Sequence, residues 1–234
     1  MKTDRPESQT WHEFYSQNQS GARYPTEWVV RTLAGGNYPS LQMPKNEYQG
    51  SRILDLSCGD GRNLPLLMDL NFEVHATEIS QPQVDRLARK AETLGWPAKF
   101  HLGQNGSLPF ADHYFSYVLA CSSMYYLDAD VSWESVLAET ARIINEDGWL
   151  IGNIPDSQNA VLKNAERQPD GSAIIKNDPF AIRNGVRFMV ADTETAVRKL
   201  LESQFEAISI GHQFDNYFGL VVSGFFFVAR KRLH

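Results

Sequence analysis

Two periodicities alternate along the middle of this 234-residue chain, and their order constrains the fold more than any other feature. Short apolar runs typical of strands occupy 52–56, 72–77, 99–102, 114–121 and 149–154. Helical segments, whose apolar residues recur every three or four positions, lie between several of these runs, as over 131–144. Strands joined through helices pair in parallel, because the crossover returns the chain in the same direction. The sequence therefore predicts an α/β fold with a doubly wound sheet.

The C-terminal part of the chain breaks this alternation. After a helical pattern over 193–202, two strand-like runs, 205–211 and 220–231, are separated by HQFDNYFG with no helix between them. This spacing predicts a terminal antiparallel hairpin, with HQFDNYFG as its loop. The segment 156–186 is polar and weakly periodic, and we expect it to form a lid or substrate segment.

The first 49 residues have a different character. Their aromatic residues predict two short amphipathic helices, one with Trp11, Phe14 and Tyr15 and one from Tyr24 to Leu33. We expect 1–49 to form a helical cap on a single domain that spans 1–234, because the chain has no internal repeat and no long linker.

Composition removes several classes of protein. With 22 Lys and Arg against 28 Asp and Glu, the net charge of −6 offers no attraction for nucleic acid or an anionic membrane surface. Two cysteines, Cys58 and Cys121, are too few for a disulfide-built scaffold. No apolar run approaches the roughly 20 residues that span a bilayer. We therefore expect a cytoplasmic protein that binds neither nucleic acid nor membrane.

The turn SCGDGRN at 57–63 is the strongest chemical signal, since it joins the first strand to its helix, where doubly wound sheets bind ligands. Glu78 ends the second strand, 17 residues after Gly61, where an acid accepts the hydroxyl hydrogens of an adenosine ribose. Leu64 occupies the place of the third glycine of a dinucleotide fingerprint, and Asp60 adds a negative charge beside the helix start. A phosphate-free adenosine cofactor therefore fits better than a dinucleotide.

The sequence resembles class I S-adenosylmethionine-dependent methyltransferases in four successive motifs: ILDLSCGDGRN, VHATEIS, GQNGSLPF and YFSYVLACSSMYYL. The resemblance runs from about Tyr24 to Lys231. It implies a Rossmann-like, seven-stranded sheet with an antiparallel C-terminal strand, S-adenosylmethionine as cofactor and S-adenosylhomocysteine as product. Matched motif by motif, it implies that the cofactor is bound by Arg23, Tyr24, Asp55, Ser57, Cys58, Gly59, Gly61, Glu78, Ile79, Gln104, Asn105, Ala120 and Cys121.

Two departures from the family pattern bear on this site. Ser57 replaces the usual first glycine of the turn, which we expect to be tolerated only if its backbone keeps a negative φ. Gln104 stands where an aspartate is usual, so the adenine amino group would meet an uncharged amide oxygen.

The acceptor is harder to read from the sequence. The segment after the fourth strand lacks the Asn/Asp-Pro-Pro-aromatic signature of enzymes that methylate amines of bases, and no acidic cluster indicates a catalytic metal. We therefore expect transfer to an oxygen or nitrogen of a small molecule, without a metal. Candidate general bases are Tyr125, Tyr126, Asp156 and His212. Each also has a plain structural role: the tyrosines as pocket walls, Asp156 as a turn residue and His212 as a solvated loop residue.

Two alternatives remain open. One is a subunit that binds S-adenosylmethionine or S-adenosylhomocysteine without catalysis. The other is a nicotinamide-dependent oxidoreductase on a related fold, which Leu64 and Asp60 disfavour. The identity of the acceptor, the methylated atom and the oligomeric state cannot be derived from these residues.

Overall fold

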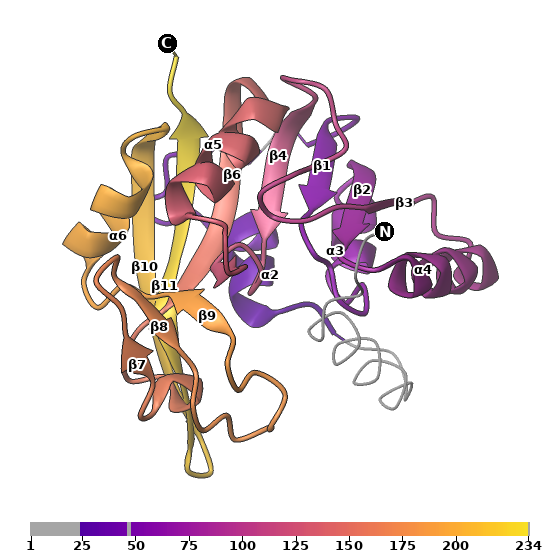
Figure 1. Ribbon diagram of the computed structural model, residues 1–234. Coiled ribbons are helices and arrows are strands. Elements are labelled where there is room, and N and C mark those ends of the chain that lie inside the picture. The colour runs from indigo at the N-terminus through magenta and orange to yellow at the C-terminus, as the bar shows by residue number, and fades with distance from the viewer. Residues whose placement is uncertain (1–23, 46–47, 234) are drawn as a thin grey trace.

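The computed structural model describes residues 24–45 and 48–233, and its centre is a seven-stranded sheet in the order β10-β11-β6-β4-β1-β2-β3 (Figure 1). Arg23 and the first of the two expected N-terminal helices lie outside the described residues. The strands of this sheet are β1 (Arg52–Asp55), β2 (Glu73–Glu78), β3 (Lys99–Leu102), β4 (Phe115–Ala120), β6 (Ile144–Pro155), β10 (Phe205–Tyr217) and β11 (Leu220–Lys231).

The direction of the strands follows the prediction. β3, β2, β1, β4 and β6 are parallel neighbours, whereas β11 runs antiparallel to both β6 and β10. This is the doubly wound, seven-stranded α/β sheet with an antiparallel C-terminal hairpin that the sequence predicts. All five parallel strands end at one edge, which brings the residues after β1, β2, β4 and β6 together.

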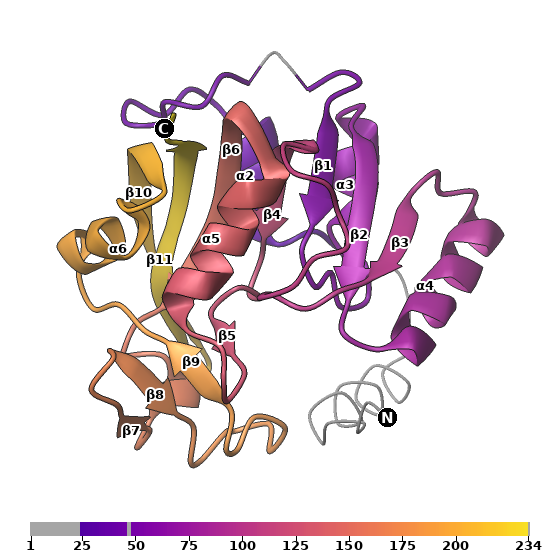
Figure 2. The same cartoon turned by 45° about the horizontal axis from the view of Figure 1, so that its top comes forward.

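Helices cover both faces of the sheet and bury two apolar clusters (Figure 2). On one face, α2 (Glu27–Ala34), α3 (Leu64–Asp69) and α4 (Gln81–Leu94) contribute Trp28, Leu67 and Leu87 to a shared core. On the other face, α5 (Trp133–Ile143) and α6 (Glu194–Leu201) contribute Leu137 and Leu201. In the described residues, no helix is both long and apolar enough to cross a bilayer.

The terminal hairpin corrects one detail of the sequence analysis. The segment HQFDNYFG is not a loop, because β10 continues through Tyr217 and pairs with β11 as far as Leu220. Only Phe218 and Gly219 connect the strands, and both have positive φ, 54° and 98°. His212 therefore lies within a strand, paired with Phe225, and not in a solvated loop.

The start of α4 departs from its local sequence pattern. Ser80 and Gln83 have the spacing of a capping box, but Ser80 makes no side-chain cap hydrogen bond. Gln83 is buried and donates instead to the carbonyl oxygen of Gly59, at 2.7 Å. The side chain that the pattern assigned to the helix start stabilises the turn after β1.

The expected lid segment contributes two strands, β7 and β8, to a small second sheet in the order β5-β9-β8-β7. The strands of this sheet are β5 (Tyr126–Leu127), β7 (Glu166–Arg167), β8 (Ser172–Ile174) and β9 (Arg187–Met189), and the 3-10 helix η1 (Ala160–Leu162) lies between β5 and β7 in the chain. The sheet thus includes residues on either side of 156–186. Figures 1 and 2 both place it beyond the carboxyl ends of β4 and β6, beside the β10–β11 hairpin.

Candidate functional site

The turn after β1 is tied to the end of β2 by hydrogen bonds. Glu78 accepts from the backbone N–H of Gly59 at 2.6 Å through Oε1 and from that of Ile79 at 3.2 Å through Oε2. Cys58 donates its N–H to the carbonyl oxygen of Thr77, at 3.0 Å. Each Glu78 oxygen still has acceptor capacity, because an ionised carboxylate offers about four lone-pair positions.

Glycine is required at one position of this turn by both conformation and space. Gly61 has a φ of +77°, and a Cβ there would lie 2.8 Å from Leu64 Cδ1. Leu64 itself is fully buried, so its side chain fills the space that a third glycine would leave open. The start of α3 is correspondingly less accessible to a pyrophosphate group.

Ser57 contradicts the expectation for its backbone. Its φ is 52°, in the left-handed region, rather than negative. Its N–H donates to Thr77 Oγ1 at 3.1 Å, which holds the turn in this conformation. A side chain at such a φ costs roughly 1–2 kcal/mol, so the rest of the turn must compensate for the absence of glycine.

Three carboxylates surround the turn and are almost completely buried: Asp55, Asp60 and Glu78. Burial, together with the charges of Glu78 and Asp60, raises the pKa of Asp55 to about 8. Burial also raises the pKa of Glu78 to about 7, opposed by the N–H groups of Gly59 and Ile79. Asp55 Oδ2 has no hydrogen-bond partner among the described residues. The turn is thus a site that would gain from a cationic ligand.

The beginning of α2 closes on this turn from the N-terminal side. Thr26 donates its N–H to Asn63 Oδ1 at 3.0 Å, and Cys121 Sγ lies 3.5 Å from Thr26 Oγ1. Arg62 Nε contacts the carbonyl oxygen of Tyr24 at 3.3 Å. Residues 24–26 therefore contact both the turn after β1 and the end of β4. The hydrogen bond between Thr26 and Asn63 could not be predicted from the sequence.

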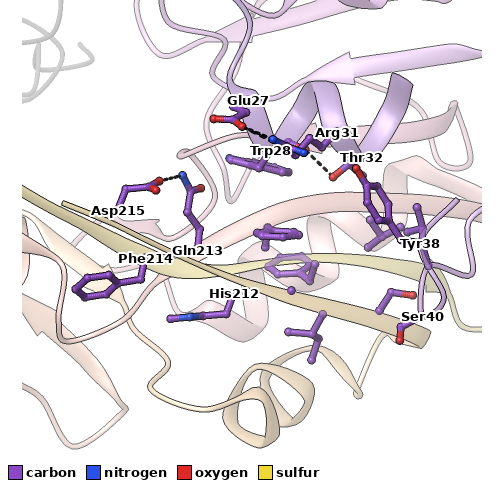
Figure 3. Close-up of a pocket in the computed structure, with 17 residues that line it drawn as sticks. Glu27, Trp28, Arg31, Thr32, Tyr38, Ser40, His212, Gln213, Phe214 and Asp215 are labelled. Atoms are coloured by element: carbon purple, nitrogen blue, oxygen red, sulfur yellow. Dashed lines mark hydrogen bonds and ion pairs between the residues drawn. The ribbon is translucent and has the colours of Figure 1, made fainter. Parts of the chain in front are cut away.

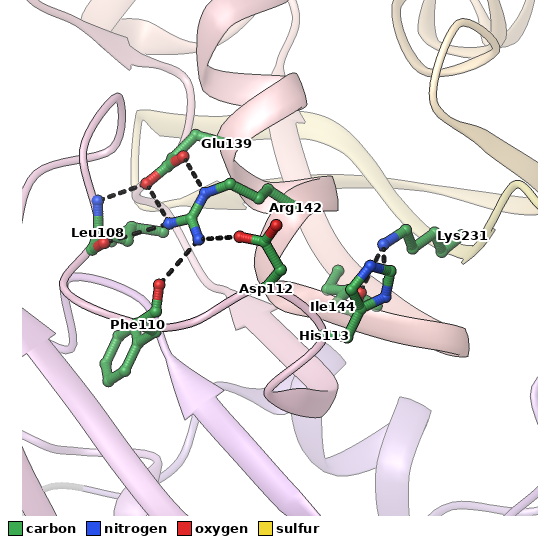
Figure 4. Close-up of polar contacts among 8 residues, drawn as sticks. All are labelled: Leu108, Phe110, Asp112, His113, Glu139, Arg142, Ile144 and Lys231. Carbon is green, nitrogen blue, oxygen red and sulfur yellow. Dashed lines mark hydrogen bonds and ion pairs between the residues drawn. The ribbon is translucent and has the colours of Figure 1, made fainter. Parts of the chain in front are cut away.

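The segment after β3 is bound to α5 by several polar contacts (Figure 4). Glu139 accepts from the N–H of Leu108 at 2.6 Å, and Arg142 donates to the carbonyl oxygen of Phe110 at 2.8 Å. Arg142 also pairs with Asp112, at 2.7 Å. These contacts fix the loop that carries the expected adenine-binding residues.

Within that loop, Gln104 and Asn105 have different surroundings. Gln104 is exposed and forms a backbone bridge with Ser107. Asn105 Nδ2 donates to the carbonyl oxygens of Ser123 and Tyr126, at 3.0 and 3.1 Å. Asn105 thus links the loop to the end of β4 and to β5, a contact that the spacing of residues in the sequence does not reveal.

Both cysteine thiols are protonated at neutral pH. Burial raises the pKa of Cys58 well above its usual range, and burial likewise raises the pKa of Cys121. Ala120, which precedes Cys121, is fully buried at the end of β4. That Cys58, Ala120 and Cys121 line the cofactor site stays a prediction.

Two of the four candidate bases are brought together by the fold. His212 Nε2 lies 2.8 Å from Asp156 Oδ2, and Ser223 Oγ donates to the same oxygen at 2.6 Å. Asp156 Oδ1 accepts from the N–H of Gln158 at 2.9 Å. Asp156 is buried, whereas the His212 side chain is 36% exposed. An oriented imidazole with a buried carboxylate behind it can accept a proton from a substrate.

The tyrosine candidates form a different cluster. The rings of Tyr125 and Tyr126 stack at 5.1 Å, and Arg183 Nε donates to Tyr126 Oη at 3.0 Å. Burial raises the pKa of both hydroxyls, so they stay protonated. Asp178 binds Arg183 at 3.2 Å. No periodic pattern in 156–186 indicates this arginine.

The described residues contain no group of three or more His, Cys, Asp and Glu side chains arranged to hold a metal ion. That no metal takes part in the reaction stays a prediction.

Comparison with known proteins gives a family match for the part of the chain that contains the turn after β1 and the end of β2. Residues 53–148 match the family model described as a methyltransferase domain. No curated protein matches the sequence.

Solved structures match over most of the chain. An S-adenosylmethionine-dependent methyltransferase from Methanosarcina mazei is 20% identical with a TM-score of 0.64, covering 85% of this chain and 99% of the other. The 1,6-didemethyltoxoflavin-N1-methyltransferase of Burkholderia thailandensis, solved with its substrate and S-adenosylhomocysteine, is 15% identical with a TM-score of 0.62, covering 95% and 84%. The [4+2]-cyclase SpnF is 17% identical with a TM-score of 0.61, covering 89% and 80%.

The first two of these proteins use or bind the cofactor pair that the sequence predicts. The resemblance predicted from the motifs is therefore confirmed: residues 53–148 carry a methyltransferase-domain sequence on the fold of the class I S-adenosylmethionine-dependent methyltransferases.

Proposed function

We propose that this protein transfers a methyl group from S-adenosylmethionine to an oxygen or nitrogen of a small molecule, with His212 as the general base. The observation that carries the cofactor assignment is the buried carboxylate cluster around the turn after β1. The observation that carries the base is the hydrogen bond between His212 and Asp156.

The residues around the turn fit the cofactor. Glu78 can accept from both ribose hydroxyls while it keeps its bonds to Gly59 and Ile79. The unpartnered oxygen of Asp55 is a suitable acceptor for the methionine ammonium. When bound, S-adenosylmethionine supplies an electrophilic methyl group on a sulfonium.

Charge separates this cofactor from a dinucleotide. S-adenosylmethionine has a net positive charge, from its sulfonium and ammonium against one carboxylate, whereas NAD has a negatively charged pyrophosphate. When ionised, Asp55, Asp60 and Glu78 favour S-adenosylmethionine and repel NAD in a buried site, where charges are poorly screened. The Leu64 side chain, which packs against Gly61, also disfavours a dinucleotide, because it fills space that a pyrophosphate would need at the start of α3.

Proton removal is the task of the Asp156–His212 pair. With Nε2–H donated to Asp156, His212 Nδ1 is the nitrogen that takes the acceptor's proton, and the resulting imidazolium is stabilised by the buried carboxylate. Ser223 and the N–H of Gln158 hold Asp156 in place. Tyr125 and Tyr126 are weaker candidates, because their raised pKa values oppose ionisation.

The similarity to SpnF supports a second candidate, because a [4+2]-cyclase has a similar fold. In that case this chain would bind the cofactor without methyl transfer. The two candidates differ in one product, S-adenosylhomocysteine.

The experiment is a screen of small metabolites with S-adenosylmethionine, measuring S-adenosylhomocysteine by mass spectrometry. With an acceptor identified, His212→Asn is expected to lower kcat by about 10²–10⁴-fold and to remove the acidic limb of the pH–rate profile. The control is His113→Asn, since His113 is exposed and lies before β4 at the opposite end of the strand. Unchanged kcat in His212→Asn would exclude the base; cofactor binding without any turnover would favour the second candidate.

A further inference from the structure

A pocket of about 510 Å³ lies between α2 and the β10–β11 hairpin (Figure 3). One wall is α2 with the segment that follows it, including Trp28, Arg31 and Tyr38. The other is the face of the hairpin that carries Gln213 and Asp215. His212 and Phe214 also belong to the lining, although in Figure 3 their side chains point to the opposite side of the hairpin from Gln213 and Asp215. The wall that faces α2 is therefore the face of the hairpin that carries Gln213 and Asp215.

The pocket has an apolar floor. The rings of Trp28 and Phe226 stack with centroids 5.9 Å apart, and Val228 lies beside them. Gly211 leaves room for this arrangement, because a Cβ there would come within 2.4 Å of the Phe226 ring. A volume of this size and an aromatic floor are typical of sites for small organic molecules.

The charges in the wall do not cancel. Arg31 is occupied by Glu27, with its Nη2 2.8 Å from Glu27 Oε1, and this pair is neutral. Asp215 Oδ2 accepts hydrogen bonds from the Gln213 amide and from Tyr217 Oη, which are both uncharged. In the described part of the wall, Asp215 thus supplies a negative charge without a cationic partner.

We propose that this pocket binds a small organic cation with an apolar, aromatic body. The ring lies on Trp28 and Phe226, and the cationic group faces Asp215. This site includes no residue of the cofactor turn, and the proposed cation faces Asp215 rather than the side chain of His212, so the proposal does not depend on the proposed function.

The same helix connects the pocket to the cofactor turn. Glu27 and Trp28 line the pocket, while Thr26, the residue before them, binds Asn63 and contacts Cys121. A ligand that fixes α2 therefore also fixes one wall of the cofactor site. By reciprocity, the ligand and the cofactor then change each other's affinity by the same factor.

The test uses 2-phenylethylamine, which is a cation at neutral pH, and 3-phenylpropanoate, an anion with a similar body. Each is titrated into the full chain up to about 10 mM, the range of weak single-pocket ligands, and binding is followed by isothermal titration calorimetry. We expect the amine to bind at least about fivefold more tightly than the carboxylate, the effect of one partly exposed ion pair.

Two variants locate the binding. Asp215→Asn is expected to abolish the preference for the amine, and Ser40→Trp, at an exposed position in the wall, to block both probes. Asp85→Asn is the matched control, because Asp85 is exposed on α4 and also accepts from a glutamine amide. The far-UV circular dichroism of each variant shows that it is folded.

Three results would overturn the proposal: no binding of the amine, equal binding of both probes, or a preference that survives Asp215→Asn. A groove covered by a second copy of the chain would give a dimer that Ser40→Trp dissociates, with no amine bound, and would also overturn it.

Discussion

Replacing Asp55 by asparagine should have opposite effects on stability and on cofactor binding. The side chain is buried at 1% exposure, and its pKa in the folded protein is about 8, against an ordinary value of 3.8. Asparagine has nearly the same shape and does not ionise. The variant therefore removes the cost of a buried charge and leaves the packing unchanged.

The direction in which stability changes with pH follows from proton linkage. A carboxyl group with a raised folded pKa keeps its proton in the folded state while the unfolded chain loses it, so stability falls as pH rises between about 4 and about 8. A shift of about four units is at most about 6 kcal/mol. Glu78 and Asp60 share that shift, and a structure relaxes around a charge, so we expect about 2–3 kcal/mol.

The assay is urea denaturation of both proteins at pH 5 and at pH 8.5, followed by circular dichroism. Asp55→Asn should be more stable than the original protein at pH 8.5, and the difference should shrink at pH 5. Its affinity for S-adenosylmethionine should fall by about 30-fold, the loss of one charged hydrogen bond. Asp69→Asn, at an exposed position on α3, should change neither quantity.

The reasoning would be refuted if Asp55→Asn were less stable than the original protein at both pH values. It would also be refuted if the variant bound S-adenosylmethionine as tightly as the original protein.

Three further predictions concern the same turn. Glu78→Ala should weaken cofactor binding by about 1–3 kcal/mol, measured by calorimetry, because the ribose hydroxyls lose their acceptor. Glu78→Gln should weaken binding less, because the amide keeps one acceptor oxygen. Equal affinity in the original protein and both variants would contradict the assignment of Glu78 to the ribose. The affinity for S-adenosylmethionine should rise from pH 6 to pH 8.5, because Asp55 and Glu78, with pKa values of about 8 and about 7, lose their protons over this range. Calorimetry in buffers of different ionisation enthalpy should then show that binding releases protons. An affinity that does not change with pH would contradict this prediction. Ser57→Gly should raise the free energy of unfolding by about 0.5 kcal/mol. The glycine removes the strain of a side chain at a φ of 52°, and the greater entropy of glycine in the unfolded chain offsets part of that gain. A loss of stability would show that the serine is not strained.

The central sheet could be predicted because its signals are local. The run 52–56, the turn to Asn63 and the acid at Glu78 each fix a strand, a turn or a strand end within a few residues. Parallel pairing then follows from the helices between the strands. The observed β1 and β2 agree with the expected positions to within a residue or so at each end.

Features that depend on distant pairing were missed. The strands β7, β8 and β9 have two or three residues each, too few for a periodic pattern, and exist because they pair with one another. HQFDNYFG contains polar and turn-forming residues, yet pairing with β11 keeps it extended to Tyr217.

The candidate site shows the same division. Its expected cofactor residues lie mainly in one turn and at the next strand end, whereas Asp156 and His212 are 56 residues apart in the chain and meet across β11. Ser223, which completes that contact, lies in an apolar strand where no pattern singles it out.

The most direct test of the central claim is a crystal structure of the protein with S-adenosylhomocysteine, which has the nucleoside and amino acid parts of the methyl donor. We expect the two ribose hydroxyls within hydrogen-bond distance of the Glu78 carboxylate and the amino group facing Asp55. A nucleoside bound elsewhere, or with Glu78 turned away from its sugar, would contradict it.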